Sequence, residues 1–415
     1  MVKVKRDVAY TMLASALPAL GNFFAVAFAL RHMDAVWLGK SYALLAFFFV
    51  AIDLFNFGSP RIFTLDRVRS KVPTLIFLDC LSALGSTAVF VPIGLYLAQC
   101  GLIAQTQLAG LMVLAPICYG MSHFSLGALR LCGRSGVICA ISLTSALSRV
   151  LIIYWLVKHR DLQEYLPDLL LLVEAGYGAM LLLAYLTARQ ADRKQFSFRM
   201  FDYRTFFIEN RREILGSWYA NAIFSGAKHL DMILVTFIVG PAGGSLYRGV
   251  KSIHNLAFNF GQGIALLLTG KLKHRADLLL LSIRRCEMAA GGLVSLVIIA
   301  LASLLACRIK LFPLAEIGSH ALQVAFMFAA FAGATLIFLC RVLSLLVFSA
   351  NRASFVLVST LEVSMSLILI SGMSYAVGLI GALSGILIAT ATVMSMSFAL
   401  SRREARKVLM GTIGK

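Results

Sequence analysis

Long apolar stretches of about twenty residues recur along the whole chain, separated by short polar segments. A helix needs roughly 20 apolar residues to cross the hydrocarbon core of a bilayer, whereas a strand of a membrane barrel needs only about 10. The pattern therefore predicts an all-α polytopic membrane protein with about twelve transmembrane helices. The expected spans are residues 8–30, 41–60, 74–98, 108–126, 137–157, 169–187, 214–239, 247–270, 288–307, 321–340, 353–371 and 378–400.

Lysine and arginine gather in every second gap between these stretches. Of the 38 basic residues, 28 fall in the two termini and the gaps on their side, six fall in the opposite gaps, and four fall inside the stretches. Segments rich in Lys and Arg resist translocation and stay cytoplasmic. The distribution therefore predicts that both termini are cytoplasmic. The gaps at the opposite surface are short. The basic start of the chain before residue 8 resembles a signal peptide, but the apolar stretch after it is long enough for an uncleaved first span.

The longest basic gap divides the chain near its middle. It is expected to be a cytoplasmic linker over residues 188–213, between a six-helix bundle at 1–187 and a second at 214–415. Seven arginines and lysines alternate there with five phenylalanines, a composition typical of an interfacial helix on an anionic leaflet. A solvated linker with positive-inside charge is the alternative.

The two halves carry a short sequence repeat. Phe-Asn-Phe-Gly occurs at residues 55–58, at the end of the second span, and again at 258–261, late in the eighth. Because each half has an even number of spans, both start on the same side, so the repeat is expected to be parallel, about an axis along the membrane normal.

The eighth span carries the strongest local signal for a site. Its polar residues follow steps of three, four, four and three, which places them on one helical face. These residues are Arg248, Lys251, Asn255, Asn259 and Gln262. Such a stripe needs water or protein opposite it rather than lipid, so it predicts one wall of a hydrated cationic cavity, with Lys251 lining it. A buried polar seam, or an Arg248 that reaches the interface, is the alternative.

Other charged residues within the spans are candidates for substrate binding or ion coupling. Lys228 and Asp231 are three residues apart and could pair on one helical face, and Arg149 lies in the fifth span. Buried acids can bind protons or cations, so membrane carboxylates are the candidate coupling sites, although partnership with a basic residue is an equally plain role. These acids are Asp53, Asp79, Glu174, Asp231 and Glu362.

Composition excludes several classes of protein. The chain is 60% hydrophobic and 14% charged, with a mean hydropathy of +0.87, which excludes a soluble enzyme with a single anchor. No gap has room for a folded soluble domain, and neither GxxxxGK[ST] nor HExxH occurs. The net charge of +19 reflects the positive-inside pattern, so no nucleic acid partner is expected. The eight cysteines are scattered without CxxC spacing, and neither a metal site nor a cofactor is expected.

Two segments resemble a known family. In the first, residues 25–63, Gly39-Lys40-Ser41-Tyr42 precedes an apolar span ending in Phe57-Gly58. In the second, Asp231-Met232-Ile233-Leu234 leads to Gly240-Pro241 and Gly244-Ser245-Leu246-Tyr247. With six plus six spans and a basic central loop, the chain resembles the Wzx-type polysaccharide flippases of the multidrug/oligosaccharidyl-lipid/polysaccharide exporter superfamily. Arg248 directly after Tyr247 departs from the small or apolar residues that are commoner there.

The resemblance implies a function. Such proteins are secondary transporters that flip an undecaprenyl-pyrophosphate-linked oligosaccharide, as for O-antigen and lipopolysaccharide, across the bacterial inner membrane by alternating access. Glycosyltransferases and a polysaccharide polymerase would be partners, besides membrane lipids. Basic residues of the spans fit the role of attracting the anionic head group, and these are Arg149, Lys228, Arg248 and Lys251.

Three other classes compete with this interpretation. A cation-coupled multidrug exporter of the same superfamily should have an acidic and aromatic cavity, and charge number alone does not separate the two. A membrane scaffold would not need an inward-facing charged stripe. A membrane glycosyltransferase would need acidic or histidine-bearing outer loops, and the only acidic one contains Asp161, Glu164 and Asp168. The chain is therefore expected not to be an enzyme.

Overall fold

The computed structural model describes residues 2–58, 72–191, 203–225, 229–272, 320–350 and 352–413. These residues form helices and short turns, with no strand among them. Seven helical segments of the described chain are long and apolar enough to cross a membrane. The expected all-α polytopic fold is thus confirmed, and the expected span at 288–307 lies outside the described residues.

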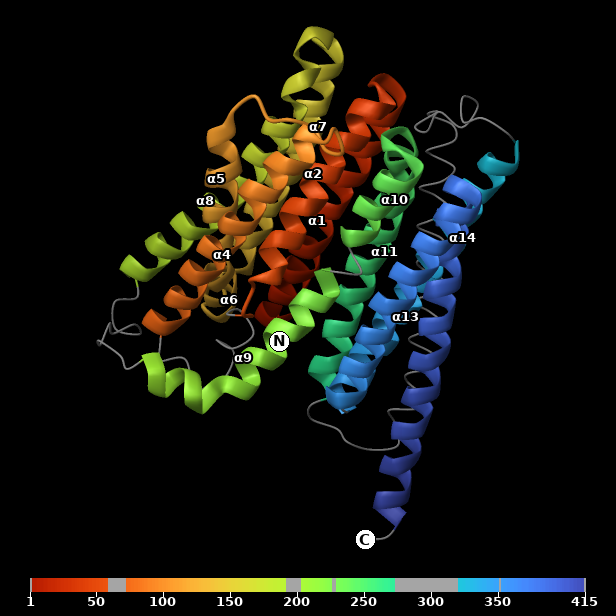
Figure 1. The fold of residues 1–415 in the computed structure, drawn as a ribbon. Coiled ribbons are helices and arrows are strands. Elements are labelled where there is room, and N and C mark those ends of the chain that lie inside the picture. Colours follow the sequence, from red (N-terminus) through yellow and green to blue (C-terminus); the bar gives the residue numbers. More distant parts are fainter. Residues whose placement is uncertain are drawn as a thin grey trace.

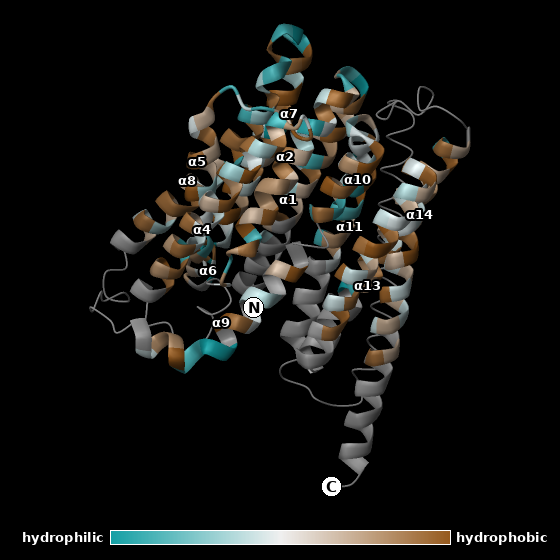
Figure 2. Ribbon diagram, in the orientation of Figure 1, coloured by the Kyte–Doolittle hydropathy of each residue, from teal (hydrophilic) through white to brown (hydrophobic). Residues whose placement is uncertain are grey.

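The helices of the first part of the chain overlap the expected spans, although α2 begins at Ala35 and ends at Leu54 where we expected a span over 41–60. They are α1 (Val2–His32), α2 (Ala35–Leu54), α4 (Val72–Gln99), α5 (Ala109–Gly120), α6 (His123–Leu131), α7 (Ser135–Lys158), the 3-10 helix η2 (Arg160–Tyr165) and α8 (Leu166–Ala191). In Figure 1 these helices, coloured red to yellow-green, lie together on one side of the molecule. Brown apolar residues run along most of their length in Figure 2.

The second part contributes α9 (Tyr203–Ser225), α10 (Asp231–Val239), α11 (Pro241–Leu272), α13 (His320–Ala350) and α14 (Arg352–Ile413). The last four lie side by side on the other side of Figure 1. The long α14 joins the two expected spans at 353–371 and 378–400, and Gly378, with a φ of 65°, interrupts it between them. The division at residues 187 and 214 stays a prediction, since α8 continues to Ala191 and α9 begins at Tyr203.

One span that we expected to be continuous, the fourth, is broken within the described residues. The fourth separates into α5 and α6 at Met121 and Ser122, where Oδ2 of Asp79 accepts a 2.6 Å hydrogen bond from the backbone N–H of Phe124. The carboxylate satisfies an amide that the first turn of a helix leaves without a partner, so it favours a new helix start there. Of the expected seventh span, the structure describes the end of α9, up to Ser225, and a helical stretch from residue 229 that leads into α10, and residues 226–228 lie outside the described chain.

The expected repeat is not matched by local conformation. In the first copy, α2 has already ended at Leu54, Gly58 has a φ of 76°, and its N–H donates to Oδ1 of Asn56 at 2.9 Å. In the second copy, residues 258–261 lie within the continuous helix α11. The four-residue identity therefore does not mark structurally equivalent positions.

The two sides of the molecule meet through α1 and α2, which pack against α11, while α2 also contacts α10. The approach is closest where α2 and α11 begin. A Cβ on Gly39 would lie 1.8 Å from the carbonyl oxygen of Pro241, so only glycine allows the two backbones to touch there. This contact closes the end of the molecule at which α1 ends and α2 begins, the upper end in Figure 1.

Candidate functional site

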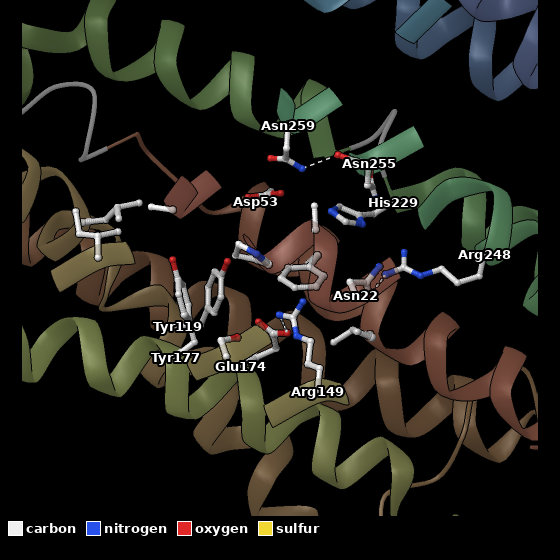
Figure 3. A pocket seen from close by; sticks show the side chains of 18 of the residues that line it. Asn22, Asp53, Tyr119, Arg149, Glu174, Tyr177, His229, Arg248, Asn255 and Asn259 are labelled. Atoms are coloured by element: carbon white, nitrogen blue, oxygen red, sulfur yellow. Dashed lines mark hydrogen bonds and ion pairs between the residues drawn. The ribbon is translucent and has the colours of Figure 1, made fainter. Parts of the chain in front are cut away.

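A pocket of about 360 Å³ lies between the first group of helices and α11. Its wall comes mostly from α1, α2 and α5 to α8, and the second part of the chain contributes His229 and three residues of α11. It reaches from the middle of the bundle toward the end opposite the Gly39–Pro241 contact, since Asp53 and Arg130 lie near the ends of α2 and α6. Ten of its residues are labelled in Figure 3.

Arg149 and Glu174 form an ion pair in the wall of the pocket. Nη2 of Arg149, on α7, lies 2.5 Å from Oε1 of Glu174, on α8. The side chain of Glu174 is 2% exposed, and Figure 3 shows the two side chains pointing toward each other. A buried carboxylate and guanidinium so close largely neutralise each other, so this pair adds polarity but little net charge.

Arg248 enters the pocket from α11 without an acidic partner in the described chain. Nη2 donates to Oδ1 of Asn22 at 3.1 Å, and the guanidinium lies 5.0 Å from the centre of the Tyr42 ring. A neutral amide and an aromatic face hold the guanidinium in place, and neither forms an ion pair with it. The remaining guanidinium N–H groups can therefore donate to an anion.

Arg130, on α6, is a second pocket arginine without an ion pair to any acid that the structure describes. Arg130 was not among the expected site residues, because it falls in the basic gap between the fourth and fifth expected spans. The break between α5 and α6 carries this residue into the wall of the pocket. No hydropathy signal in the sequence marks that break.

Aromatic rings line the part of the pocket nearest α5 and α8. The Tyr119 and Tyr177 rings lie 6.0 Å apart, and the Phe49 ring stacks on His229 at 5.1 Å with 21° between the planes. Such faces suit apolar or ring-shaped groups of a ligand. The pocket therefore combines three arginines, two carboxylates and several rings, and no metal-binding group of three His, Cys, Asp or Glu side chains occurs among the described residues.

The stripe expected on the eighth span is divided. Arg248, Asn255 and Asn259 line the pocket, and Nδ2 of Asn259 donates to the carbonyl oxygen of Asn255 at 2.7 Å. The expectation that Lys251 would line the cavity is not met, because its Nζ lies 2.6 Å from Oδ2 of Asp231 and it is not among the lining residues. Of Gln262 the structure describes only the helical backbone.

The other expected sites are spread over the molecule. Asp53 lines the pocket, whereas Asp79 caps α6 and does not line it. Glu362, on α14, also lies away from the pocket, within the fields of Arg341 and Lys251. Lys228 and its expected pairing lie outside the described residues.

A basic residue that we placed in a gap, Arg341, is instead buried within α13, with its guanidinium 4.4 Å from the centre of the Phe258 ring.

Asp168, which we placed in the acidic outer loop, lies in the first turn of α8 and has a structural role. Its two carboxylate oxygens accept 2.9 Å hydrogen bonds from the backbone N–H groups of Gln107 and Leu108, and its side chain is buried. These bonds satisfy amides at the start of α5. Asp168 is therefore committed to holding α5 against α8.

Comparison with known proteins gives a likeness of fold. No protein-family model and no curated protein sequence matches the chain. An inward-facing multidrug resistance MATE family transporter of the MOP superfamily superimposes with a TM-score of 0.64 at 13% identity, covering 95% of this chain and 96% of that one. An outward-facing structure of such a transporter gives 0.61 at 13% identity, covering 98% and 96%. A MOP superfamily transporter from Pyrococcus furiosus gives 0.50 at 12% identity, covering 98% and 96%.

The likeness extends over nearly the full length of each of these chains. Identities of 12–13% show a common architecture and do not transfer a substrate. The chain is a multi-span membrane protein with the fold of the MATE transporters of the MOP superfamily.

Proposed function

We propose that this protein is a secondary transporter that moves an anionic amphiphile across the membrane by alternating access through the pocket. The transported class would be a phosphate-bearing, lipid-linked oligosaccharide, and the chain would act as a flippase in surface polysaccharide synthesis. The fold supports the coarse part of the proposal, since every solved structure described above is a transporter of one superfamily. The site supports the finer part.

The observation that supports an anionic substrate is the ion pairing of the pocket arginines. Arg149 is neutralised by Glu174, whereas Arg130 and Arg248 form no ion pair with a described carboxylate. A guanidinium in a partly dry site is costly unless an anion compensates it, and it matches the oxygens of a phosphate with two parallel hydrogen bonds. The rings of Phe49, Tyr119 and Tyr177 would contact apolar or sugar faces beside the phosphates.

Multidrug export is the second candidate, and the fold likeness points to it more directly. The inward-facing and outward-facing neighbours are both multidrug resistance transporters. Asp53, Glu174 and the aromatic rings would serve a cationic, aromatic drug. Against this stands the MOP superfamily transporter from Pyrococcus furiosus, whose reversed pocket polarity suggests a different function for that protein. It supports the idea that this fold can accept substrates of opposite charge.

Binding measurements on the purified protein separate the two candidates. An undecaprenyl-pyrophosphate-linked oligosaccharide and a lipophilic cationic dye are titrated against the natural protein, Arg130→Gln and Glu174→Gln. For an anionic substrate, Arg130→Gln should weaken binding by roughly tenfold to a hundredfold, the loss expected for one charge-assisted hydrogen bond. The exposed Arg160, at the other end of the molecule, supplies a control variant, Arg160→Gln, which should bind normally.

The pattern of losses decides the substrate class. Tight dye binding that Glu174→Gln abolishes and Arg130→Gln spares would establish the cationic drug and end the flippase proposal. Lipid binding that depends on Arg130 should be accompanied by loss of surface polysaccharide in cells producing Arg130→Gln at normal abundance.

The proposed orientation places both ends of the chain and the 188–213 segment in the cytoplasm of a bacterial cell, at the inner membrane. The basis is the division of basic residues between the two sides, 28 against six. A single cysteine introduced at position 200 of a cysteine-free variant should react with a membrane-impermeant maleimide only after the cells are opened. Labelling of intact spheroplasts at this position would reverse the orientation.

A further inference from the structure

Helix α9 has one face buried in the protein and an opposite face that is open. Phe206, Asn210 and Ile214 follow one another at steps of four and are 0%, 3% and 1% exposed. Phe206 and Ile214 pack into the apolar cluster of α4, α6 and α8. On the other face, Ile208 and Leu215 are 59% and 58% exposed. The helix is therefore anchored on the first group of helices and leaves two large aliphatic side chains uncovered.

Two basic residues and one acidic residue, the exposed Glu209, lie between these aliphatic side chains along α9, so the basic residues are in excess. Arg211 and Arg212 are exposed, and neither forms an ion pair within the described chain. Figure 2 shows this part of α9 as a teal segment at the lower end of the molecule. Exposed aliphatic groups next to unpaired arginines are the arrangement of helices that lie at the boundary between headgroups and acyl chains.

The depth of α9 agrees with that boundary. Nε1 of Trp218 donates a 2.7 Å hydrogen bond to the carbonyl oxygen of Leu54, the last residue of the membrane-spanning helix α2. Trp218 thus lies where the hydrocarbon core should end, and tryptophan is enriched at that level. In Figure 1, α9 runs across the lower end of the first group of helices toward the second.

The residue after Trp218 contacts the other side of the molecule. The hydroxyl of Tyr219 lies 3.1 Å from Oγ1 of Thr360, on α14. Two consecutive residues of α9 therefore hold the end of α2 and the side of α14. We call Trp218 and Tyr219, with their two partners, the α9 clamp.

We propose that the open face of α9 docks on the acidic headgroup layer of the membrane leaflet at this end, and that this docking stabilises the α9 clamp. The occupant is identified by charge complementarity, since two unpaired arginines flanked by aliphatic side chains fit phosphate headgroups over an apolar layer. Acidic lipid would then favour the state in which the two groups of helices are held together at the end carrying both termini. The proposal concerns the outside of the protein and does not depend on the substrate of the pocket.

Hydrogen exchange of the full-length protein in nanodiscs tests the proposal. The two bilayers are pure phosphatidylcholine and an equal mixture of phosphatidylcholine and phosphatidylglycerol. For the natural chain, the amides of residues 206–219 should exchange more slowly in the acidic bilayer, by roughly tenfold, given the attraction of about two arginines to an acidic surface. In Arg211→Gln/Arg212→Gln this dependence on lipid should disappear.

A matched control removes two exposed basic residues from the opposite end. Lys158→Gln/Arg160→Gln should retain the full lipid dependence of α9, because both residues lie at the end of α7 and the start of η2. Equal exchange of residues 206–219 in the two bilayers for the natural chain would overturn the proposal, and would leave a protein partner as the occupant of this face. Lipid dependence that persists in Arg211→Gln/Arg212→Gln would also overturn it.

A second variant tests whether the α9 clamp is a contact separate from docking on the lipid. Trp218→Phe keeps an aromatic ring and removes the N–H that binds Leu54. It should lower the protection of residues 214–225 in the acidic bilayer while residues 206–212 keep their lipid dependence. If both parts of the helix respond alike, docking and clamping are not separate contacts and the second half of the proposal is wrong.

Discussion

Lys251 and Asp231 form a buried ion pair, in which Nζ of Lys251 lies 2.6 Å from Oδ2 of Asp231. Their side chains are 9% and 1% exposed, and the hydroxyl of Tyr247 donates to the same carboxylate oxygen at 2.8 Å. The contact joins α10 to α11 directly below the place where α11 meets α2. Lys251 therefore holds α10 against α11, and the pocket is lined by Arg248, Asn255 and Asn259 of the expected stripe.

Removal of one partner of this ion pair should destabilise the protein strongly. Lys251→Ala leaves a buried carboxylate whose one remaining donor among the described residues is Tyr247, and loss of one partner of a buried pair costs about 3–5 kcal/mol. Thermal unfolding in detergent should show the loss, together with reduced abundance in the membrane. Asp231→Asn/Lys251→Ala should recover most of the stability, because no uncompensated charge remains. If Lys251→Ala unfolds normally and only transport fails, Lys251 belongs to the substrate pathway after all.

The Arg149–Glu174 pair should behave differently, because it borders the pocket. Glu174→Gln keeps the shape of the side chain and leaves Arg149 with its charge uncompensated, so the pocket becomes more basic by one charge. Affinity for an anionic lipid headgroup should rise or stay equal, whereas a cationic dye should bind at least tenfold more weakly, as one close charge pair in a partly dry site would give. Isothermal titration of both ligands checks this. Weaker binding of the anionic ligand would contradict the proposed substrate class.

Hydropathy predicted the approximate place of most described helices, because membrane-spanning helices must be apolar for about 20 residues whatever their partners. The breaks in the helices could not be predicted the same way. The start of α6 depends on Asp79, which is 45 residues away along the chain, and no local signal connects the two. Arg130 was consequently assigned to a loop, although it lines the pocket.

The stripe on α11 shows a related limit. Its spacing correctly places Arg248, Asn255 and Asn259 on one side of the helix, since helical geometry is local. The partner of each residue is set by the neighbouring helices. Lys251 meets Asp231 of α10, and this contact depends on how α10 packs, which the sequence of α11 does not contain. The spacing of the polar residues therefore predicted a polar face on α11. It could not predict which of these residues line the pocket and which form an ion pair.

The cap at the start of α6 can be tested separately from the pocket. Asp79→Ala removes the acceptor of the 2.6 Å bond from the Phe124 N–H and leaves a buried amide without this partner. The expected loss of stability is about 1–3 kcal/mol, with faster hydrogen exchange confined to residues 122–131. Asp79→Asn, which keeps an acceptor oxygen, should lose less. Faster exchange throughout the protein in Asp79→Ala would mean that Asp79 supports the whole bundle, and would contradict a local capping role.

The contact of Gly39 with Pro241 predicts a way to open the closed end. A methyl group on Gly39 would meet the carbonyl oxygen of Pro241 at 1.8 Å, and backbone atoms on both sides cannot yield without moving α2 away from α11. Gly39→Ala should therefore disfavour the state closed at this end and favour one open there. Cysteines introduced near the starts of α2 and α11 should crosslink at least several-fold more slowly in Gly39→Ala than with Gly39 retained.

Gly176, on α8, provides the matched control, because a Cβ there would meet nothing within 4 Å. Gly176→Ala should leave the crosslinking rate unchanged and stabilise α8 by up to about 1 kcal/mol, the helix preference of Ala over Gly. Crosslinking at the natural rate in Gly39→Ala would show that the two helix starts can separate without a change in the state of the protein, and would remove this contact as the closure of that end.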